Sequence, residues 1–395
     1  MKMANNNFRF IGKIQEIKDS EKFHPVERRT FDSGWTQTTV KFNVISNGNR
    51  IMCLSQGGKW SKDEKNVIHT FTKTTTDANG KVIKGEKIDV KWDERFNPKT
   101  VDQIAGFKRF IVDLGDKQKR YRLEDAVKAF EDRTITDELI TETECNTLEK
   151  AKEALEKSNK RRKIFVSEWD MAEYMAKVVS SEKIKDSLFL ISGTQEIQYS
   201  AEKGKFYVNY RINRIELLRE DTSPNTNMFI DFYFSENCVD DSDFAESGKG
   251  YLNGYTTYYD SNAKSNGFMP ITIVVRDEKK LNGMKRKLSA EDDAIKNISL
   301  VVNVIDGTEM AAITYDDLDD DTKADIECGF YSAEEAIRAL GGSKAGDRVT
   351  ELRLVGPNPK RNKVEDTTFT VEDMTPAKAI VEENDEAVDD EDDIL

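Results

Sequence analysis

The chain has 395 residues, with 60 Lys and Arg against 74 Asp and Glu, and a formal net charge of −14. A nucleic-acid binder usually carries a basic balance, so the total argues against one. The charge is unevenly spread, however: +8 over residues 1–125, −13 over 126–381 and −9 over 382–395. A basic front and an acidic tip leave nucleic-acid binding open, and the length predicts two or three domains.

Composition and motifs exclude several other classes of protein. No apolar run of about 18 residues is present, and no apolar signal segment is evident near the N-terminus, so we expect a cytoplasmic protein. P-loop, HExxH and GxSxG motifs are absent, so we predict no enzyme and no cofactor. The cysteines form no CxxC pair and only two histidines are present, so we predict no metal site; the cysteines are Cys53, Cys145, Cys238 and Cys328.

The first part of the chain is strand-rich. Val40, Phe42 and Val44 alternate with Lys41 and Asn43, as in a strand with one buried face. Similar segments with turn residues between them cover 8–17, 35–45, 50–58, 66–76 and 81–92. Short strands separated by turns indicate a small barrel or sandwich, which we assign to residues 1–120.

The pattern then becomes helical over residues 121–182. Met171, Tyr174, Met175 and Val178 recur at helical spacing, and we interpret this stripe as core packing. Further on, the acidic run at 316–321 could bind a divalent ion. A solvated loop explains that run better, because it lacks the spacing and the Gly of a calcium loop.

Strands resume in a second β-rich unit, assigned to residues 183–356. Its predicted strands cover 186–200, 204–218, 228–234, 250–259, 269–275, 299–307 and 351–356. A short helix at 332–341 begins with a capping box, Ser332 and Glu335. Residues 8–17 and 189–197 match weakly, each with a central Gly before Gln-Glu-Ile, which is consistent with two copies of one barrel type.

One strand suggests the chemistry of a binding surface. Lys205, Tyr207, Asn209 and Arg211 share a face of the strand. Cations follow phosphates and aromatic rings stack on bases, so this mixture is typical of single-strand binders. An ordinary solvated face explains the strand equally well by itself.

Neighbouring segments favour the binding interpretation. Residues 188–259 hold 14 of the 36 aromatic residues, several of them among Asn, Gly and Thr. In the first unit, Arg9 shares a strand face with Lys13, and Trp35 shares another with Lys41. The residues predicted to contact nucleic acid are Arg9, Lys13, Trp35, Lys41, Lys59, Trp60, Lys205, Tyr207, Arg211 and Tyr255.

The C-terminal residues 357–395 are polar and end in an acidic run, which predicts a flexible linker and a disordered tail. The final residues are Asp389, Asp390, Glu391, Asp392, Asp393, Ile394 and Leu395. A run of acidic residues that ends in two apolar residues can dock in a basic pocket with a hydrophobic floor on a partner protein. They can also lie on the chain's own basic groove and compete with nucleic acid.

The sequence GKFYVNYRINRIEL (204–217), the two strand-rich units and the tail DDEDDIL resemble the single-stranded DNA-binding proteins of bacteria and their phages. The resemblance implies an α+β, mainly β fold. Two OB-like five-stranded barrels would flank the helical segment and precede the acidic tail. Two barrels, the helical segment and the Ile-Leu ending favour a long phage-type member over a bacterial one.

The implied function is non-catalytic, sequence-independent binding of single-stranded DNA in phage replication, recombination or repair. The tail would recruit replication or recombination proteins in the host cytoplasm. Two alternatives remain: a phage structural or scaffolding protein whose β domains bind protein, and a nuclease-like enzyme with clustered acids and magnesium. We find no compelling set of acids for the nuclease.

Overall fold

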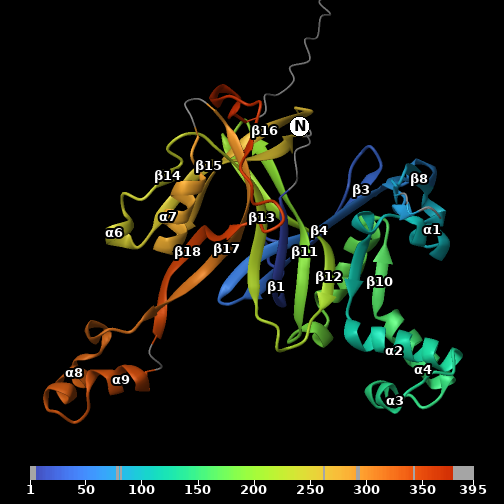
Figure 1. The fold of residues 1–395 in the computed structure, drawn as a ribbon, viewed down its shortest axis with the longest axis horizontal. Helices are drawn as coiled ribbons and strands as arrows, with labels where there is room; N and C mark the ends of the chain where they lie inside the picture. The colour runs from blue at the N-terminus through green and yellow to red at the C-terminus, as the bar shows by residue number, and fades with distance from the viewer. Residues whose placement is uncertain are drawn as a thin grey trace, which may run out of the picture.

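The computed structural model describes residues 6–76, 80, 82–260, 263–290, 294–340 and 343–376. Strands dominate and form one large sheet, with most helices at its periphery (Figure 1). This confirms the predicted α+β class with mainly β structure. The predicted tail residues from Asp389 to Leu395 lie outside the described residues.

Five strands pair into a closed arrangement, which we call the first circuit. They are β1 (Asn7–Glu16), β3 (Trp35–Ser46), β4 (Asn49–Trp60), β11 (Leu188–Ser200) and β12 (Lys205–Leu217). β1 pairs with β3 and β11, β3 with β4, and β11 with β12, all antiparallel. A parallel pairing of β4 with β12 closes the circuit. Alternate side chains point inward, so Phe8, Phe10 and Phe42 are buried in its core.

β1 changes partners along its length, and Gly12 lies at the change. Residues 7–13 pair with β11 on one edge, whereas on the other edge residues 7–11 pair with β13 (Asn225–Phe234) and residues 13–16 pair with β3. A Cβ atom on Gly12 would lie 2.5 Å from the carbonyl oxygen of Ile45. A glycine is therefore required for the two backbones to approach this closely.

The first circuit crosses the division predicted at residue 183. β11 and β12 belong by sequence pattern to the second unit, yet they complete the circuit of the N-terminal strands. The two segments of the proposed repeat are neighbours in one circuit, with Gly12 opposite Phe189. Local patterns do not reveal this pairing, because the partners are far apart in the sequence.

Helix α5 (Glu168–Val178) packs against β3 and β4. Met171, Met175 and Val178 are buried in the main core, which confirms the interpretation of this stripe as packing. α5 therefore belongs structurally to the first circuit, although it lies within the predicted helical segment.

The remaining helices of that segment form a separate cluster at one corner of the molecule (Figure 1). They are α2 (Lys117–Glu131), α3 (Asp137–Thr143) and α4 (Leu148–Lys160), and strands β9 (Phe110–Asp113) and β10 (Arg162–Phe165) flank them in the chain. Leu123 and Ala151 are buried in a small core of their own. The buried Arg120 of α2 pairs with the buried Asp113 of β9.

A second set of five strands closes in the same way, and we call it the second circuit. It contains β13 (Asn225–Phe234), β15 (Gly250–Asp260), β16 (Ser265–Val275), β17 (Lys296–Ala312) and β18 (Ser343–Pro357). In each circuit the first strand pairs with the second and the fourth, and the third is parallel to the fifth. α7 (Glu278–Lys287) lies between the third and fourth strands in sequence, as α5 does in the first circuit.

The two circuits join through their first strands. β1 and β13 pair antiparallel, from Asn7 opposite Phe229 to Ile11 opposite Asn225. The sheet therefore continues from one circuit into the other, and we call this junction the seam.

Three additions surround the circuits. An inserted lobe at 61–109 contains β5 (Val67–Phe71), β8 (Lys87–Lys91) and α1 (Pro98–Gln103). The β17–β18 hairpin carries α8 (Asp320–Glu327) and α9 (Ala333–Ala339) at its far end, and α9 has the predicted capping box (Figure 1). In the acidic run just before them, Asp319 caps α8 with its side chain. Residues 358–376, which we call the strap, run back over the second circuit and include β19 (Glu365–Asp366).

Candidate nucleic-acid interface

A hollow of about 640 Å³ lies between the first circuit and the inserted lobe. We call it the tryptophan groove, because Trp35, Trp60 and Trp92 line it. Trp169, the fourth and last tryptophan of the chain, lies immediately beside it, since the preceding Glu168 is also in the lining. Three of the four indole rings of the protein therefore line one hollow.

The register of two strands positions the predicted pair Trp35 and Trp60. The two residues are directly opposite at the end of the β3–β4 hairpin, and their ring centroids lie 5.2 Å apart in an edge arrangement. The Trp35 ring lies over Gly58, where a Cβ atom would be 2.1 Å from Cζ2 of the ring. Gly58 thus makes room for the indole against the strand.

Cations accompany these rings. Nζ of Lys59 lies 5.5 Å from the Trp169 ring centroid, and Nζ of Lys65 lies 5.4 Å from that of Trp60. Lys108 also lines the groove; it is the last residue of a short 3-10 helix (Gly106–Lys108) just before β9. Such distances allow cation–π attraction and leave each ammonium group near the rim.

Within the groove, His69 and Asp89 form a pair on neighbouring strands of the lobe, with Nδ1 2.6 Å from Oδ1. The lining holds two lysines and two carboxylates, and both carboxylates are paired, Asp89 with His69 and Glu168 with Arg211.

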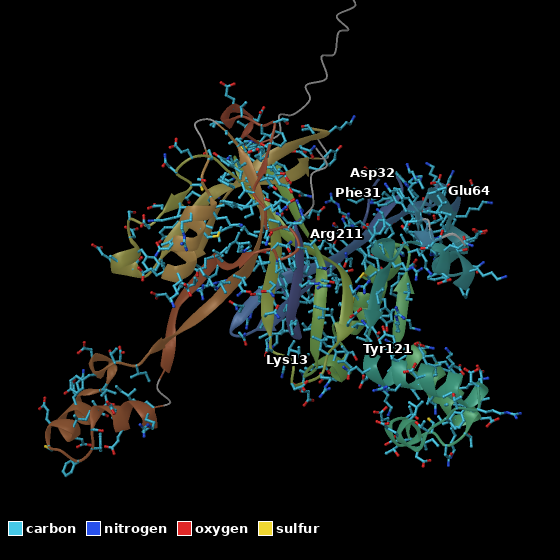
Figure 2. All side chains as sticks on the ribbon, viewed as in Figure 1. Lys13, Phe31, Asp32, Glu64, Tyr121 and Arg211 are labelled. Carbon is cyan, nitrogen blue, oxygen red and sulfur yellow. The ribbon has the colours of Figure 1, made fainter. Side chains whose placement is uncertain are left out.

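Arg211 is partly buried and pairs with Glu168, a lining residue of the groove, instead of projecting into solvent. Its Nη2 donates to Oε2 of Glu168 at 2.6 Å and to the carbonyl oxygen of Gln56 at 2.9 Å. Its Nη1 lies 3.7 Å from Glu196. Burial raises the pKa of Glu168, while Arg211 acts in the opposite direction. Figure 2 shows Arg211 near the middle of the molecule, where it holds strand and helix together.

The other predicted residues of β3 and β12 are outside the lining of the groove. Lys41 lies on the same face of β3 as Trp35, with its Nζ 5.0 Å from the Phe23 ring centroid. Lys205 is exposed at the end of the β11–β12 hairpin. Tyr207 is 45% exposed and borders a hollow of about 450 Å³ together with Tyr259 of the second circuit.

Three predicted residues lie elsewhere. Arg9 lines a hollow at the seam. Lys13 lies at the far end of β1, 3.8 Å from Asp186, well away from Arg211 (Figure 2). Tyr255 packs against a buried cluster that includes Tyr233, and the strap covers this cluster.

The inserted lobe supplies groove residues that the sequence analysis did not single out. The lining residues that residues 61–109 contribute include Lys65, His69, Trp92 and Lys108. The density of Lys and aromatic residues in this stretch was the available signal, but only pairing in space shows that it faces β3 and β4.

The second circuit lacks a corresponding surface. β15 and β16 contain no Lys or Arg, whereas β3 and β4 contain Lys41, Arg50 and Lys59. The strap covers part of this face, with Phe369 5.1 Å from Phe268 and 6.1 Å from Tyr233 between ring centroids. A hydrogen bond from the Phe268 amide to the Thr375 carbonyl oxygen, 2.9 Å long, fixes it there.

Metal sites and membrane-spanning helices are both absent from the described ranges. No group of three or more His, Cys, Asp or Glu side chains in these ranges is arranged to hold a metal ion. None of the helices there combines the length and apolarity needed to cross a bilayer.

Comparison with known proteins gives a structural similarity but no match in sequence. No family model and no curated protein matches the chain. Among solved structures, it is similar to a deletion mutant of the single-stranded DNA binding protein from Thermus aquaticus. The identity is 9%, the coverage is 90% of this chain and 93% of that chain, and the TM-score is 0.30. A similarity at this TM-score supports no assignment of function.

Proposed function

We propose that the two circuits are OB-like barrels, spanning 7–217 and 225–357, and that the protein binds single-stranded DNA without catalysis. OB barrels bind oligonucleotides on the face of their second and third strands and through the neighbouring loops. In the first circuit these strands are β3 and β4, which carry Trp35, Trp60 and Lys59. The observation that carries the proposal is the gathering of three of the four tryptophans and two lysines, Lys65 and Lys108, in one groove at this face.

The chemistry of the groove fits a flexible, unpaired strand. Each base has a π-face, so stacking on Trp35 and Trp60 accepts any sequence. Lys59, Lys65 and Lys108 would attract the phosphates between the stacked bases, which makes binding depend steeply on salt. Duplex DNA keeps its bases stacked inside the helix and offers no free faces to these rings.

Titration of the full-length protein with oligo-dT tests the proposal through its intrinsic tryptophan fluorescence. We expect quenching on binding, because three of the four indoles of the protein line the groove. Trp60→Ala should weaken binding about 5- to 150-fold, since one stacked base contributes about 1–3 kcal/mol. The matched control is Tyr121→Ala, an exposed aromatic on α2 outside the groove, which should bind like the parent.

Equal affinities of the Trp60 and Tyr121 variants would contradict the assignment of the groove. Absence of any shift of a labelled oligonucleotide by the parent protein would overturn single-strand binding and favour β domains that bind protein.

The wider role follows from the same binding activity. A protein that coats exposed single strands acts in replication, recombination or repair, and we propose this role in a phage. We further propose that residues 382–395 recruit partner proteins or compete with DNA for basic surfaces. A pull-down of replication proteins that succeeds equally without residues 382–395 would contradict the recruiting role.

A further inference from the structure

A second hollow, of about 530 Å³, lies where the two circuits meet, and we call it the seam hollow. β1, β11, β12, β13, β17 and the start of the strap all contribute to it. Its polar lining residues are Asn7, Arg9, Ser192, Asn213, Asp231, Ser299, Asn358, Lys360 and Arg361. The amides and hydroxyls in this lining are uncharged groups that can form hydrogen bonds with phosphate oxygens.

The charge of the seam hollow is positive. Asp231 is the one acid in its lining, and Nη1 of Arg361 lies 3.1 Å from its Oδ1. Burial raises the pKa of Asp231, whereas the neighbouring Arg361 guanidinium lowers it. The charges of Asp231 and Arg361 therefore offset each other. Arg9 and Lys360 are both exposed, and neither has an ion pair within the described ranges. These two cations therefore remain available to a ligand.

Other hollows on the protein differ from it. The hollow beside Tyr207 is lined by Glu196 and Asp260, and a further one on β15 and β16 by Glu236; neither has a Lys or Arg in its lining. Among these hollows in the described part of the chain, only the tryptophan groove and the seam hollow combine cations with hydrogen-bonding groups.

Strand register connects the two basic hollows. Arg211, which pairs with Glu168 in the lining of the groove, is opposite Thr194 of β11, and Thr194 is opposite Asn7 of β1, which lines the seam hollow. Neighbouring strands lie about 4.8 Å apart, so this row spans roughly 10 Å from β12 to β1. The hollows are therefore close enough for one extended strand to reach both.

We propose that the seam hollow binds the phosphates of single-stranded DNA that leaves the tryptophan groove. The inference rests on the proposed function and extends it from one circuit to the junction of both. Arg9 and Lys360 would each contact a phosphate, while the neutral groups around them accept any sequence. The strand would then cross β12, β11 and β1, instead of following the covered face of the second circuit.

The experiment compares Arg9→Ala/Lys360→Ala in the full chain with Lys279→Ala/Arg286→Ala, which removes the same charge from exposed positions on α7. Binding is measured with oligo-dT of about 4 and about 16 nucleotides, the two ends of the range that one OB barrel covers. We expect the seam variant to bind the short oligonucleotide like the parent and the long one roughly five- to tenfold more weakly. Its slope of log K against log salt should fall by about 1.4 for the long oligonucleotide, because two phosphate contacts are lost.

The outcomes separate the two proposals. If the parent protein binds neither oligonucleotide, the proposed function fails. If the parent binds both and the seam variant keeps the affinity and the salt slope of the α7 variant, the seam site is refuted while the groove stands. Equal weakening for short and long oligonucleotides would also refute it, because the short one is expected to occupy the groove alone. Unchanged melting temperatures of both variants confirm that each remains folded.

Discussion

Gly58 determines whether the tryptophan groove can exist, and its replacement is the sharpest test of the geometry. A Cβ at this position would lie 2.1 Å from the Trp35 ring, far inside contact distance. Gly58 has no positive φ, so alanine suits the backbone and the collision with the ring is the main effect. Gly58→Ala should displace the Trp35 indole while leaving every cation and ring in the chain. Loss of one stacked base, about 1–3 kcal/mol, would weaken oligo-dT binding about 5- to 150-fold.

The assay is a fluorescence titration with oligo-dT, together with near-ultraviolet circular dichroism to report the movement of the indole. Gly283→Ala on α7 is the control, because a Cβ there meets nothing within 4 Å. This variant should bind like the parent and gain about 1 kcal/mol of stability, since alanine favours a helix over glycine. A displaced Trp35 with unchanged affinity would refute the argument that this ring stacks on a base.

Two further predictions concern stability and reactivity. Asp113→Ala should cost about 3–5 kcal/mol in the unfolding of the α2–α4 cluster, because it leaves the buried Arg120 charge without its partner; chemical denaturation measures this, and a loss below about 1 kcal/mol would contradict it. Alkylation of the native protein at pH 8 should modify the exposed Cys328 first. Burial raises the pKa of Cys238 to about 11, which keeps it a protonated, enclosed thiol. Mass spectrometry that finds Cys238 modified as fast as Cys328 would disprove this.

Local patterns in the sequence predicted the elements well. The alternation around Phe42 gave β3 and its hairpin partner, Ser332 and Glu335 gave the start of α9, and the stripe with Met175 gave a buried helix face. These signals depend on residues a few positions apart. Closure of the circuits depends on pairings such as Gly12 with Phe189, which no local pattern contains. The predicted division of the chain therefore missed that the N-terminal strands are completed by β11 and β12.

The candidate site shows the same limit. Trp35 was found because it shares a strand face with Lys41, and Trp60 because it follows Lys59 in a basic stretch; their direct pairing is seen only in the structure. Arg211 has the alternation of an exposed contact residue, but its carboxylate partner Glu168 comes from α5, 43 positions earlier. Tyr255 stands among polar neighbours in the sequence, yet Phe369 and the rest of the strap cover its cluster. In both cases a distant segment supplies the partner.

The two circuits share one connectivity but differ in their outer faces, and this difference accounts for the uneven charge. Residues 1–125, with a net charge of +8, include the strands and most of the lobe that form the tryptophan groove. Residues 126–381, with −13, include a second circuit whose β15 and β16 carry no cation and lie partly beneath Phe369. An acidic middle conflicts with nucleic-acid binding only if both circuits bind through corresponding faces. A strand that runs from the groove to the seam needs only one cation from the second half, Lys360, which lines the seam hollow.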